Sequence, residues 1–524
     1  MRKYSVLHLF FVVTILLFAG CNKKKYSIDT ELFNQSIQAL IDSKDSVQQK
    51  FLHQTYGEGN SLPYWYNTPT DFRQKFNTFR NYLNRTLLDH GIVPTLFKTD
   101  SIDKLVSSLD TVNLDYPKLA ALDMMLTKSY YDYCVALKFG CVNPRKLYPD
   151  EYYIDTKRPD SSFVRVCLKQ LDNAETLSSY LDSIQPNERK YTLFQRELRG
   201  RSKDKTTFWK IAANMERLRW VPVRNISNKH IWVNVASAQL NMMRGDSVTG
   251  TLRVGVGKAG EHETPLMIGD MYEIVLNPTW TVPTSIVVNE IVKKGAGIPS
   301  YIARNNMKVY KNGVVQNPCS IPWNTLSAKN QPYRIVQDSG ESNSLGRIKF
   351  NFDNPFSVYL HDTDSRHIFN YDRRDVSHGC VRVQNPLKLA FFCLSDIDTT
   401  KKAEVTARNL YKDKMRIAIG VKSRSVGNEK ETNKSTNQIR YIPLKQRVTV
   451  IIDYRTCVIE PGGKLAFMED YYNMDDVLIK KLKNIPVKPQ YKVKPKKEEP
   501  LTETIKQKSD STQVNTVVAK KDSI

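Results

Sequence analysis

The sequence predicts an α+β protein with more than one domain, in which a helical N-terminal region precedes a mainly-β, sandwich-like domain. Its 524 residues are enough for about three domains, at roughly 150 residues each. Apolar residues recur at helical spacing before residue 200 and alternate in short runs after about residue 208. With 40% hydrophobic and 10% aromatic residues, the chain can bury a core, which excludes a wholly disordered protein.

The helical domain is expected to span residues 21–200. Residues 70–89 carry aromatic and leucine side chains three or four positions apart, and Gly91 ends the pattern, as in an amphipathic helix. A second helix is expected from Pro117 to Gly140, because proline favours the first turn of a helix. A shorter one is expected over residues 187–199. Aromatic stripes of this kind are typical of a core, so we assign them no chemistry.

The mainly-β domain is expected over residues 208–480. Residues 231–235 and 248–256 alternate in hydrophobicity and flank turn residues at 244–246, which predicts a β-hairpin. Further short strands are expected at residues 273–276, 347–352, 358–360, 447–453 and 464–468, the last two as a pair.

The first 21 residues predict export with a lipid anchor. A basic start is followed by an apolar stretch, and the small residues Ala19 and Gly20 precede Cys21, as in a lipoprotein signal. Residues 1–20 are therefore expected to be a signal peptide, and Cys21 the lipidated N-terminus. The alternative is an uncleaved anchor helix, but an apolar stretch of about 16 residues is shorter than the ~20 that span a bilayer.

The formal net charge of +24 is compatible with several anionic partners. An exported chain does not ordinarily meet nucleic acid, so we expect attraction to an anionic wall or membrane and no nucleic-acid partner. Residues 424–437 are polar and are expected to form an inserted flexible loop. The lysine-rich residues 488–524 are expected to form a disordered tail.

The densest group of reactive side chains surrounds Cys380. Lipidation of Cys21 would leave seven of the eight cysteines, so at least one thiol stays unpaired. A catalytic thiol needs a base to take its proton, and His361 precedes Cys380 at a distance that suits two adjacent strands. Arg382 would share a strand face with Cys380 and bind a substrate carboxylate, unless it pairs with Asp375.

The run Ser-His-Gly-Cys-Val-Arg-Val at residues 377–383, preceded by His-Asp-Thr at 361–363, resembles the active-site signature of YkuD-type L,D-transpeptidases. Residues 214–217, 277–283 and 343–346 are similar to stretches of the large Gram-negative murein subgroup. The N-terminal helices resemble the scaffold domain of that subgroup. The resemblance covers roughly residues 30 to 480 and implies a YkuD-type catalytic domain over residues 208–480.

The resemblance implies a role for each reactive group. Cys380 would be the nucleophile and His361 the general acid and base, oriented by the backbone carbonyl of Asp362. Backbone N–H groups around Gly379 would form the oxyanion hole, with the Tyr359 hydroxyl as a further donor. The residues expected to contact the substrate are Arg382, Tyr359, His378 and Trp280.

The implied function is a cysteine acyltransferase that forms 3→3 cross-links in peptidoglycan. Stem tetrapeptides would be both donor and acceptor, no cofactor or metal would be needed, and carbapenems would acylate the thiol. The protein would be lipid-anchored in the cell envelope, facing the periplasm from either membrane. Two features depart from the subgroup: no peptidoglycan-binding module is visible between Leu198 and Trp209, and His378 stands where the subgroup often has serine.

Three alternatives remain open at this stage. Water could capture the same thioester, which would make the protein a carboxypeptidase or an amidase. A non-catalytic wall-binding lipoprotein is a second alternative. The third is a metal site with four histidine and cysteine donors. The last two donors are separated by a single residue, whereas the paired ligands of zinc sites are usually separated by at least two. The donors in question are His361, His367, His378 and Cys380.

Overall fold

The computed structural model describes four stretches of the chain and a few further residues. They are residues 28–57, 61–395, 438–460 and 462–485, with Lys412, Met415, Arg416, Ala418 and Ile419. Among them, no helix combines the length and the apolar character needed to cross a membrane. The expected signal peptide (1–20), the lipidation site Cys21, the inserted loop (424–437) and the tail (488–524) lie outside the described residues.

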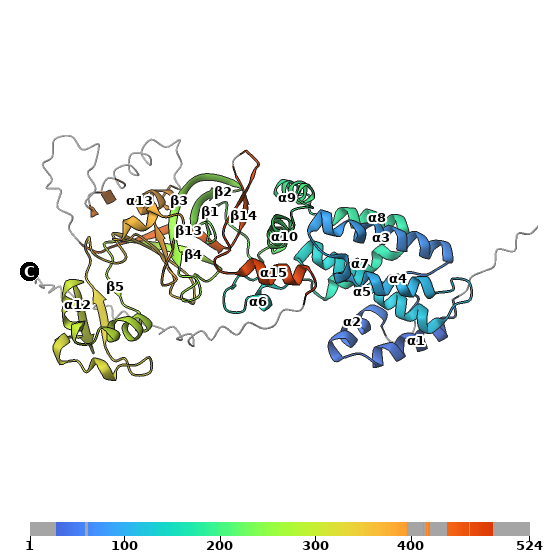
Figure 1. Cartoon of the computed structure of the whole chain (residues 1–524), viewed down its shortest axis with the longest axis horizontal. Coiled ribbons are helices and arrows are strands. Elements are labelled where there is room, and N and C mark those ends of the chain that lie inside the picture. The colour runs from blue at the N-terminus through green and yellow to red at the C-terminus, as the bar shows by residue number, and fades with distance from the viewer. Residues whose placement is uncertain are drawn as a thin grey trace, which may run out of the picture. The chain divides into compact units, whose positions relative to one another are not determined.

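The chain forms two compact units (Figure 1). The first comprises the described residues up to Cys141 and the segment Arg158–Glu188. The second comprises Val142–Lys157 and the described residues from Arg189 onward. The first unit is helical and the second contains the strands, so the predicted fold class is confirmed. Helices that precede the first strand, such as α10 (Lys205–Arg219), belong to the second unit.

The first unit is a bundle whose two longest helices are those predicted from the aromatic stripes. Its helices are α1 (Thr30–Asp42), α2 (Ser46–Tyr56), α3 (Pro69–His90), η1 (Pro94–Phe97), α4 (Thr99–Ser108), α5 (Tyr116–Phe139), α7 (Ser161–Leu168), η2 (Lys169–Leu171) and α8 (Ala174–Ser183). At the start of α3 the Thr68 side chain accepts a hydrogen bond from the Asp71 N–H, and Gly91 ends the helix with a φ of 69°.

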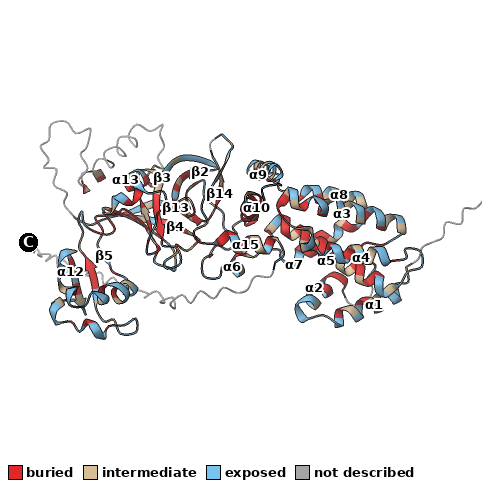
Figure 2. Ribbon diagram, in the orientation of Figure 1, coloured by how far each residue is buried: buried red, intermediate tan, exposed pale blue. Residues whose placement is uncertain are grey.

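Aromatic rings from α3 and α5 fill the core of this unit. The Phe79 ring packs edge-on against Tyr130 and Tyr133, with centroids 5.7 and 5.8 Å apart. Trp65 lies beside Phe79 and Tyr130 and is 1% exposed. In Figure 2 these helices are buried on the sides that face one another and exposed on their outer sides. The interpretation of the stripes as core is confirmed.

The second unit is built on a sheet that closes on itself. Among the described residues, nine strands follow the order β11-β3-β12-β10-β9-β4-β13-β1-β2, and β2 also pairs with β3. The strands are β1 (Lys229–Asn234), β2 (Gln239–Arg244), β3 (Ser247–Gly257), β4 (Met267–Leu276), β9 (Ile348–Phe352), β10 (Leu360–His361), β11 (Asp375–Ser377), β12 (Val381–Val383) and β13 (Arg440–Asp453).

Two strand pairings differ from the sequence expectation. The predicted hairpin joined residues 231–235 to 248–256, which correspond to β1 and β3. The structure has an additional strand, β2, between them, and the turn at Gly245 joins β2 to β3. The strand at 447–453 is part of β13, which pairs with β4 and β1. The strand at 464–468 is β15 (Leu465–Phe467), which pairs with β14 (Cys457–Ile459). Alternation identifies a strand but does not name its partner, so the predicted pair was wrong.

Helices flank the sheet within the second unit. They are α6 (Pro144–Leu147), α9 (Arg189–Gly200), α10, η7 (Arg366–Asn370), α13 (Pro386–Cys393) and α15 (Met474–Leu482). The buried side chains of Arg217 on α10 and Asp475 on α15 form an ion pair with an Nη1–Oδ1 distance of 2.5 Å. The helix predicted at 187–199 is α9.

An insertion between β4 and β9 forms a small subdomain, residues 280–337, which we call the insert subdomain (Figure 1). Its four strands run in the order β5-β8-β6-β7. Its elements are β5 (Trp280–Thr281), α11 (Thr284–Ile286), the π-helix η3 (Val287–Ile291), η4 (Val292–Gly297), α12 (Ile298–Arg304), β6 (Met307–Lys311), β7 (Val314–Gln316), η5 (Pro318–Ser320), η6 (Trp323–Thr325) and β8 (Arg334–Gln337). A separate apolar core, including Ile302, Val309 and Ile335, holds it together.

Candidate active site

Strand register brings the predicted reactive residues onto one face of the sheet. His361 on β10 pairs with Arg382 on β12 and with Lys349 on β9, so these three form a row across the sheet. Leu360 and Val381 are also paired, and they directly follow Tyr359 and Cys380. Tyr359 and Cys380 therefore form a second row, two residues before His361 and Arg382. Alternate residues of a strand share a face, so all five side chains lie on the same side.

The turn before β12 holds Cys380 in place. The Gly379 N–H donates to the Ser377 hydroxyl oxygen (3.1 Å), and that hydroxyl donates to the Cys380 carbonyl (2.6 Å). The Thr264 hydroxyl donates to the Gly379 carbonyl (2.9 Å). Gly379 has a φ of 110°, which other residues rarely adopt. The Gly379 N–H thus already has a hydrogen-bond partner within the turn, and the conformation of Gly379 shapes this turn.

Opposing influences act on the Cys380 thiol. The residue is half-buried, and burial raises the pKa of the thiol above its ordinary value. The Tyr359 backbone N–H and the cations Lys349 and Arg382 act in the opposite direction. The resting site therefore holds a neutral thiol with groups around it that favour the thiolate.

His361 is a neutral base in the resting site. It is 4% exposed, and burial, reinforced by the Arg382 and Lys349 cations, lowers its pKa to about 3. The Asp362 backbone carbonyl acts in the opposite direction, but it is not aligned for a regular hydrogen bond, since the buried Nδ1 atom of His361 has no partner. Its aromatic neighbour is Tyr359, with ring centroids 5.8 Å apart.

The side chain of Asp362 holds the strand end that carries His361. Its Oδ2 accepts from the Arg347 N–H (2.8 Å) and its Oδ1 from the Arg366 guanidinium (2.6 Å). A Cβ at Gly346 would lie 2.4 Å from the Asp362 carboxyl carbon, so the turn at 343–346 fits closely over this carboxylate. The structure thus gives Asp362 a supporting role beneath the site through its carboxylate.

Tyr359 links the sheet to the insert subdomain. Burial raises the pKa of its hydroxyl, the Cys380 thiol raises it further, and a hydrogen bond with the Trp280 side chain opposes the rise. Trp280 lies on β5, the first strand of the insert subdomain, and is half-buried. Both side chains therefore reach the surroundings of the thiol.

Lys349 belongs to the site and was not predicted from the sequence. Its Nζ lies 4.0 Å from the centroid of the Tyr359 ring. Burial lowers the pKa of Lys349, and the nearby Cys380 thiol partly offsets that effect. The sequence placed residue 349 in a strand, but only the antiparallel register to β10 brings it beside His361. The signal that could have found it is strand pairing, which one sequence does not supply.

Arg382 is available for a ligand. Asp375, the alternative partner considered from the sequence, is held by Arg373 at 2.7 Å. The Nε atom of Arg382 is buried and has no hydrogen-bond partner. A buried, incompletely paired guanidinium suits bidentate binding of a carboxylate.

His378 points to a different group of side chains. Its Nε2 lies 2.5 Å from the Glu290 carboxylate, on η3 of the insert subdomain, and its ring lies 4.7 Å from that of His262. Burial and the neighbouring His378 lower the pKa of His262. Within the described part of the chain, the three residues whose donor atoms gather closely enough to hold a metal are His262, Glu290 and His378, rather than the four considered from the sequence.

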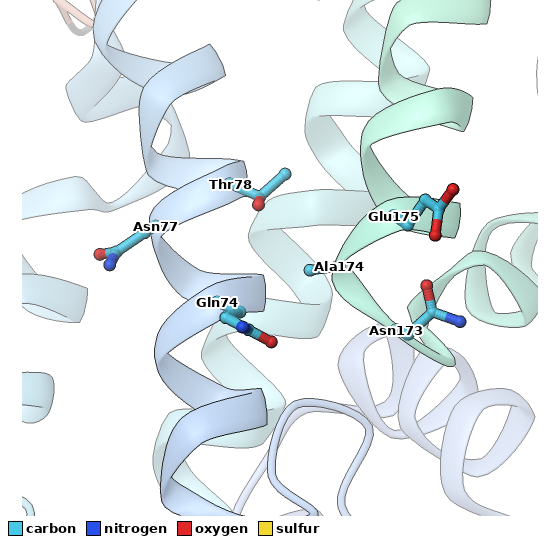
Figure 3. Close-up of a pocket in the computed structure, with 6 residues that line it drawn as sticks. All are labelled: Gln74, Asn77, Thr78, Asn173, Ala174 and Glu175. Atoms are coloured by element: carbon cyan, nitrogen blue, oxygen red, sulfur yellow. The ribbon is translucent and has the colours of Figure 1, made fainter.

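The helical unit carries a polar pocket of about 640 Å³ between α3 and α8 (Figure 3). Its lining is made of Gln74, Asn77, Thr78, Asn173, Ala174 and Glu175. These side chains offer amides, a hydroxyl and a carboxylate, but no hydrogen bond joins the Thr78 hydroxyl to the Glu175 carboxylate. We assign no reaction to this pocket.

Comparison with known proteins agrees with the geometry around Cys380. Residues 228–441 match the YkuD family, described as the L,D-transpeptidase catalytic domain. They form a YkuD L,D-transpeptidase catalytic domain. Residues 50–198 match the Scaffold family, described as a scaffold domain. The sequence motifs predict an N-terminal scaffold domain followed along the chain by a catalytic domain of this type. That prediction is confirmed.

A Haemophilus influenzae protein named "Putative L,D-transpeptidase" is 31% identical over 267 residues. The aligned part covers 50% of this chain and 52% of the relative. The chain thus spans about half the length of the curated relative it matches. The match to the YkuD family includes every residue of the two rows around Cys380.

Proposed function

We propose that the protein is a peptidoglycan L,D-transpeptidase that forms 3→3 cross-links through a cysteine thioester. The observation that carries the proposal is the row Lys349, His361 and Arg382 beside Cys380 on one sheet face. It combines a thiol, a neutral base and two cations. These are the groups needed to attack an amide and to hold a peptide that carries carboxylates.

The first half-reaction releases the terminal D-alanine of a stem tetrapeptide. The Cys380 Sγ attacks the carbonyl carbon of the third residue, a diamino acid, while His361 takes the thiol proton. The tetrahedral oxyanion accepts hydrogen bonds from the Cys380 N–H and the Tyr359 hydroxyl, in place of the engaged Gly379 N–H. The C–N bond to D-alanine then breaks, His361 returns the proton to the leaving amine, and a thioester remains.

The second half-reaction forms the cross-link. The side-chain amine of a diamino acid in a second stem attacks the thioester carbonyl, and His361 removes a proton from that amine. The C–S bond breaks, the thiolate takes the proton back, and a new amide joins the two stems. No oxidant, metal or cofactor is needed to balance these steps.

Substrate binding activates the base in this scheme. Arg382 and Lys349 contribute to the low pKa of His361, which disfavours the imidazolium. A stem-peptide carboxylate bound to Arg382 neutralises that cation, so the pKa of His361 rises when the donor is in place. His361 is therefore a stronger base when a donor occupies the site than when the site is empty.

The test is an assay of the lipid-free protein with purified tetrapeptide muropeptides, analysed by mass spectrometry. The expected products are dimers linked between two diamino acids, with loss of D-alanine, and none from Cys380→Ala. Tripeptides without dimers would instead assign the hydrolase, since water would then capture the thioester. Dimers formed by Cys380→Ala would rule out the thioester mechanism.

Carbapenems provide a substrate-independent check on the nucleophile. Attack of Cys380 on the strained β-lactam carbonyl opens the ring and leaves the drug attached through a thioester. Intact mass spectrometry should show one adduct on the wild type and none on Cys380→Ala. An unmodified wild type after prolonged exposure would contradict the proposed reactivity of the thiol.

A further inference from the structure

Three side chains beside the active-site turn come together from three different segments. His262 lies in the loop after β3, Glu290 lies on η3 of the insert subdomain, and His378 lies two residues before Cys380. Their donor atoms all lie within 4.8 Å of one another, and all three side chains are exposed. None of them takes part in the two half-reactions as written above.

We infer that His262, Glu290 and His378 form a binding site for a zinc-class divalent cation, which ties the insert subdomain to the turn that carries Cys380. Two imidazole nitrogens and one carboxylate oxygen are a donor set that zinc accepts, whereas magnesium and calcium prefer oxygen ligands throughout. Three protein ligands leave a fourth position for water, which is compatible with an exposed site.

Two of the three donors are held in place by the backbone. The His262 N–H donates to the Lys258 carbonyl (2.9 Å), and the Lys258 N–H donates to the Ser377 carbonyl (2.9 Å). A Cβ at Gly257 would lie 1.9 Å from the His262 carbonyl oxygen, so this loop sits directly on the end of β3. The loop of His262 and the turn of His378 thus form one fixed half of the site.

Glu290 supplies the other half. It belongs to the insert subdomain, which has its own core and is connected to the sheet through the chain ends at residues 280 and 337. A cation bound by all three side chains joins these two bodies next to the thiol. Such a link restrains the insert subdomain, including Trp280, relative to Tyr359 and Cys380.

Cation binding is measured on the full chain without its lipid, with Cys319→Ala and Cys380→Ala as the background. Among the described cysteines, Cys319 is the exposed one and Cys380 is the active-site thiol, and both substitutions remove a thiol that could also bind zinc. The probes are Zn²⁺ by calorimetry and Co²⁺ by its visible absorption. We expect one equivalent to bind, at least about tenfold more weakly in His262→Gln and in Glu290→Gln, because even outer-shell substitutions cost roughly tenfold in affinity.

His367→Gln and Glu261→Gln are the matched controls and should bind like the background. His367 is an exposed histidine of the same unit, and Glu261 is an exposed carboxylate next to His262 that pairs with Lys258. Absence of one-to-one binding, or equal affinity in all variants, would overturn the site. The His378–Glu290 contact would then be an ion pair alone.

The link to the insert subdomain has its own readout. Zn²⁺ should slow amide hydrogen exchange over residues 284–304 in the background protein and leave it unchanged in Glu290→Gln. Binding without slower exchange would contradict the restraint of the insert subdomain. Because all measurements use a protein without Cys380, their outcome does not depend on the proposed transpeptidase activity.

Discussion

The two cations beside Cys380 help one reactive group of the site and hinder the other. Lys349 and Arg382 lower the pKa of the thiol and also lower that of His361. The first effect favours the nucleophile and the second weakens the base. A ligand carboxylate bound to Arg382 would neutralise that cation and so raise both pKa values.

Replacing Lys349 with methionine tests this balance. Loss of the cation raises the pKa of the Cys380 thiol, so less thiolate is present at neutral pH. We expect alkylation of Cys380 by iodoacetamide at pH 7.5 to slow by about three- to tenfold, since one pKa unit is a factor of ten. The pH profile of alkylation should move to higher pH.

The control for this variant is Lys308→Met. Lys308 is an exposed lysine of the insert subdomain, and its Nζ lies 2.8 Å from the Asp338 carboxylate. Its alkylation profile should match the wild type. A profile for Lys349→Met that coincides with the wild type would return Lys349 to a packing role against Tyr359.

Acid should destabilise the second unit, because His361 is buried there in its neutral form. Its pKa is about 3 in the folded protein and about 6.5 in an unfolded chain. Between these values the unfolded chain takes up a proton that the folded chain does not, so stability present above pH 6.5 is lost as the pH falls toward 3. The full loss is on the order of 4–5 kcal/mol, at about 1.4 kcal/mol per pKa unit.

His361→Asn removes this proton uptake. Between pH 7 and pH 4.5 the free energy of unfolding of the variant should gain on the order of 2–3 kcal/mol relative to the wild type. Urea titrations at several pH values measure it, with the exposed His367→Asn as the control. A constant difference between variant and wild type across this range would contradict a neutral, buried His361.

Single site residues could be predicted from the sequence where they stand in a short run of neighbouring residues with a distinctive pattern. Cys380 and His361 stand in short, distinctive runs, and the structure brings them onto one sheet face. Lys349 and Glu290 could not be found in this way. Each reaches the site through a partner far away in the sequence, and no residue beside it indicates that partner.

Among the elements, the long helices were predicted well and the strand partners were not. The boundaries of α3 and α5 follow from the spacing of apolar residues and from Gly91, Pro117 and Gly140, which are local features. Strand pairing depends on contacts across the whole sheet. That is why β2 was overlooked, and why the strand at 464–468 was assigned to the wrong neighbour.

The contact between α10 and α15 gives an element-scale prediction. Arg217 and Asp475 are buried, and the Thr456 hydroxyl also donates to the Asp475 carboxylate (2.7 Å). Arg217→Ala leaves a buried carboxylate without its cation, so it should destabilise the catalytic unit by about 3–5 kcal/mol. Urea denaturation measures the change.

Two further variants separate charge from packing. The double variant Arg217→Met/Asp475→Leu removes both charges and should recover most of the loss. Lys480→Ala breaks an exposed pair with Asp476 on the same helix, with an Nζ–Oδ2 distance of 2.6 Å, and should change stability by less than about 0.5 kcal/mol. A mild effect of Arg217→Ala would indicate that water replaces the guanidinium.

At the scale of the whole molecule, the candidate active site lies in one of the two units. The side chains described around Cys380 belong to the second unit, whereas the first has an aromatic core and a polar pocket to which we assign no reaction. The net charge of +24 adds attraction to anionic surfaces, which is sensitive to salt and carries little specificity.

We propose that lipidation of Cys21 attaches the protein to a membrane. A lipidated N-terminus buries acyl chains worth about 0.8 kcal/mol per CH₂, far more than screened surface charge provides at physiological salt. Cys21→Ala should move the protein from the membrane fraction to the soluble fraction of fractionated cells. Cross-linking of soluble muropeptides by the purified variant should be unchanged, because the site lies in the second unit. Retention of Cys21→Ala in membranes at high salt would show that another segment holds the protein there.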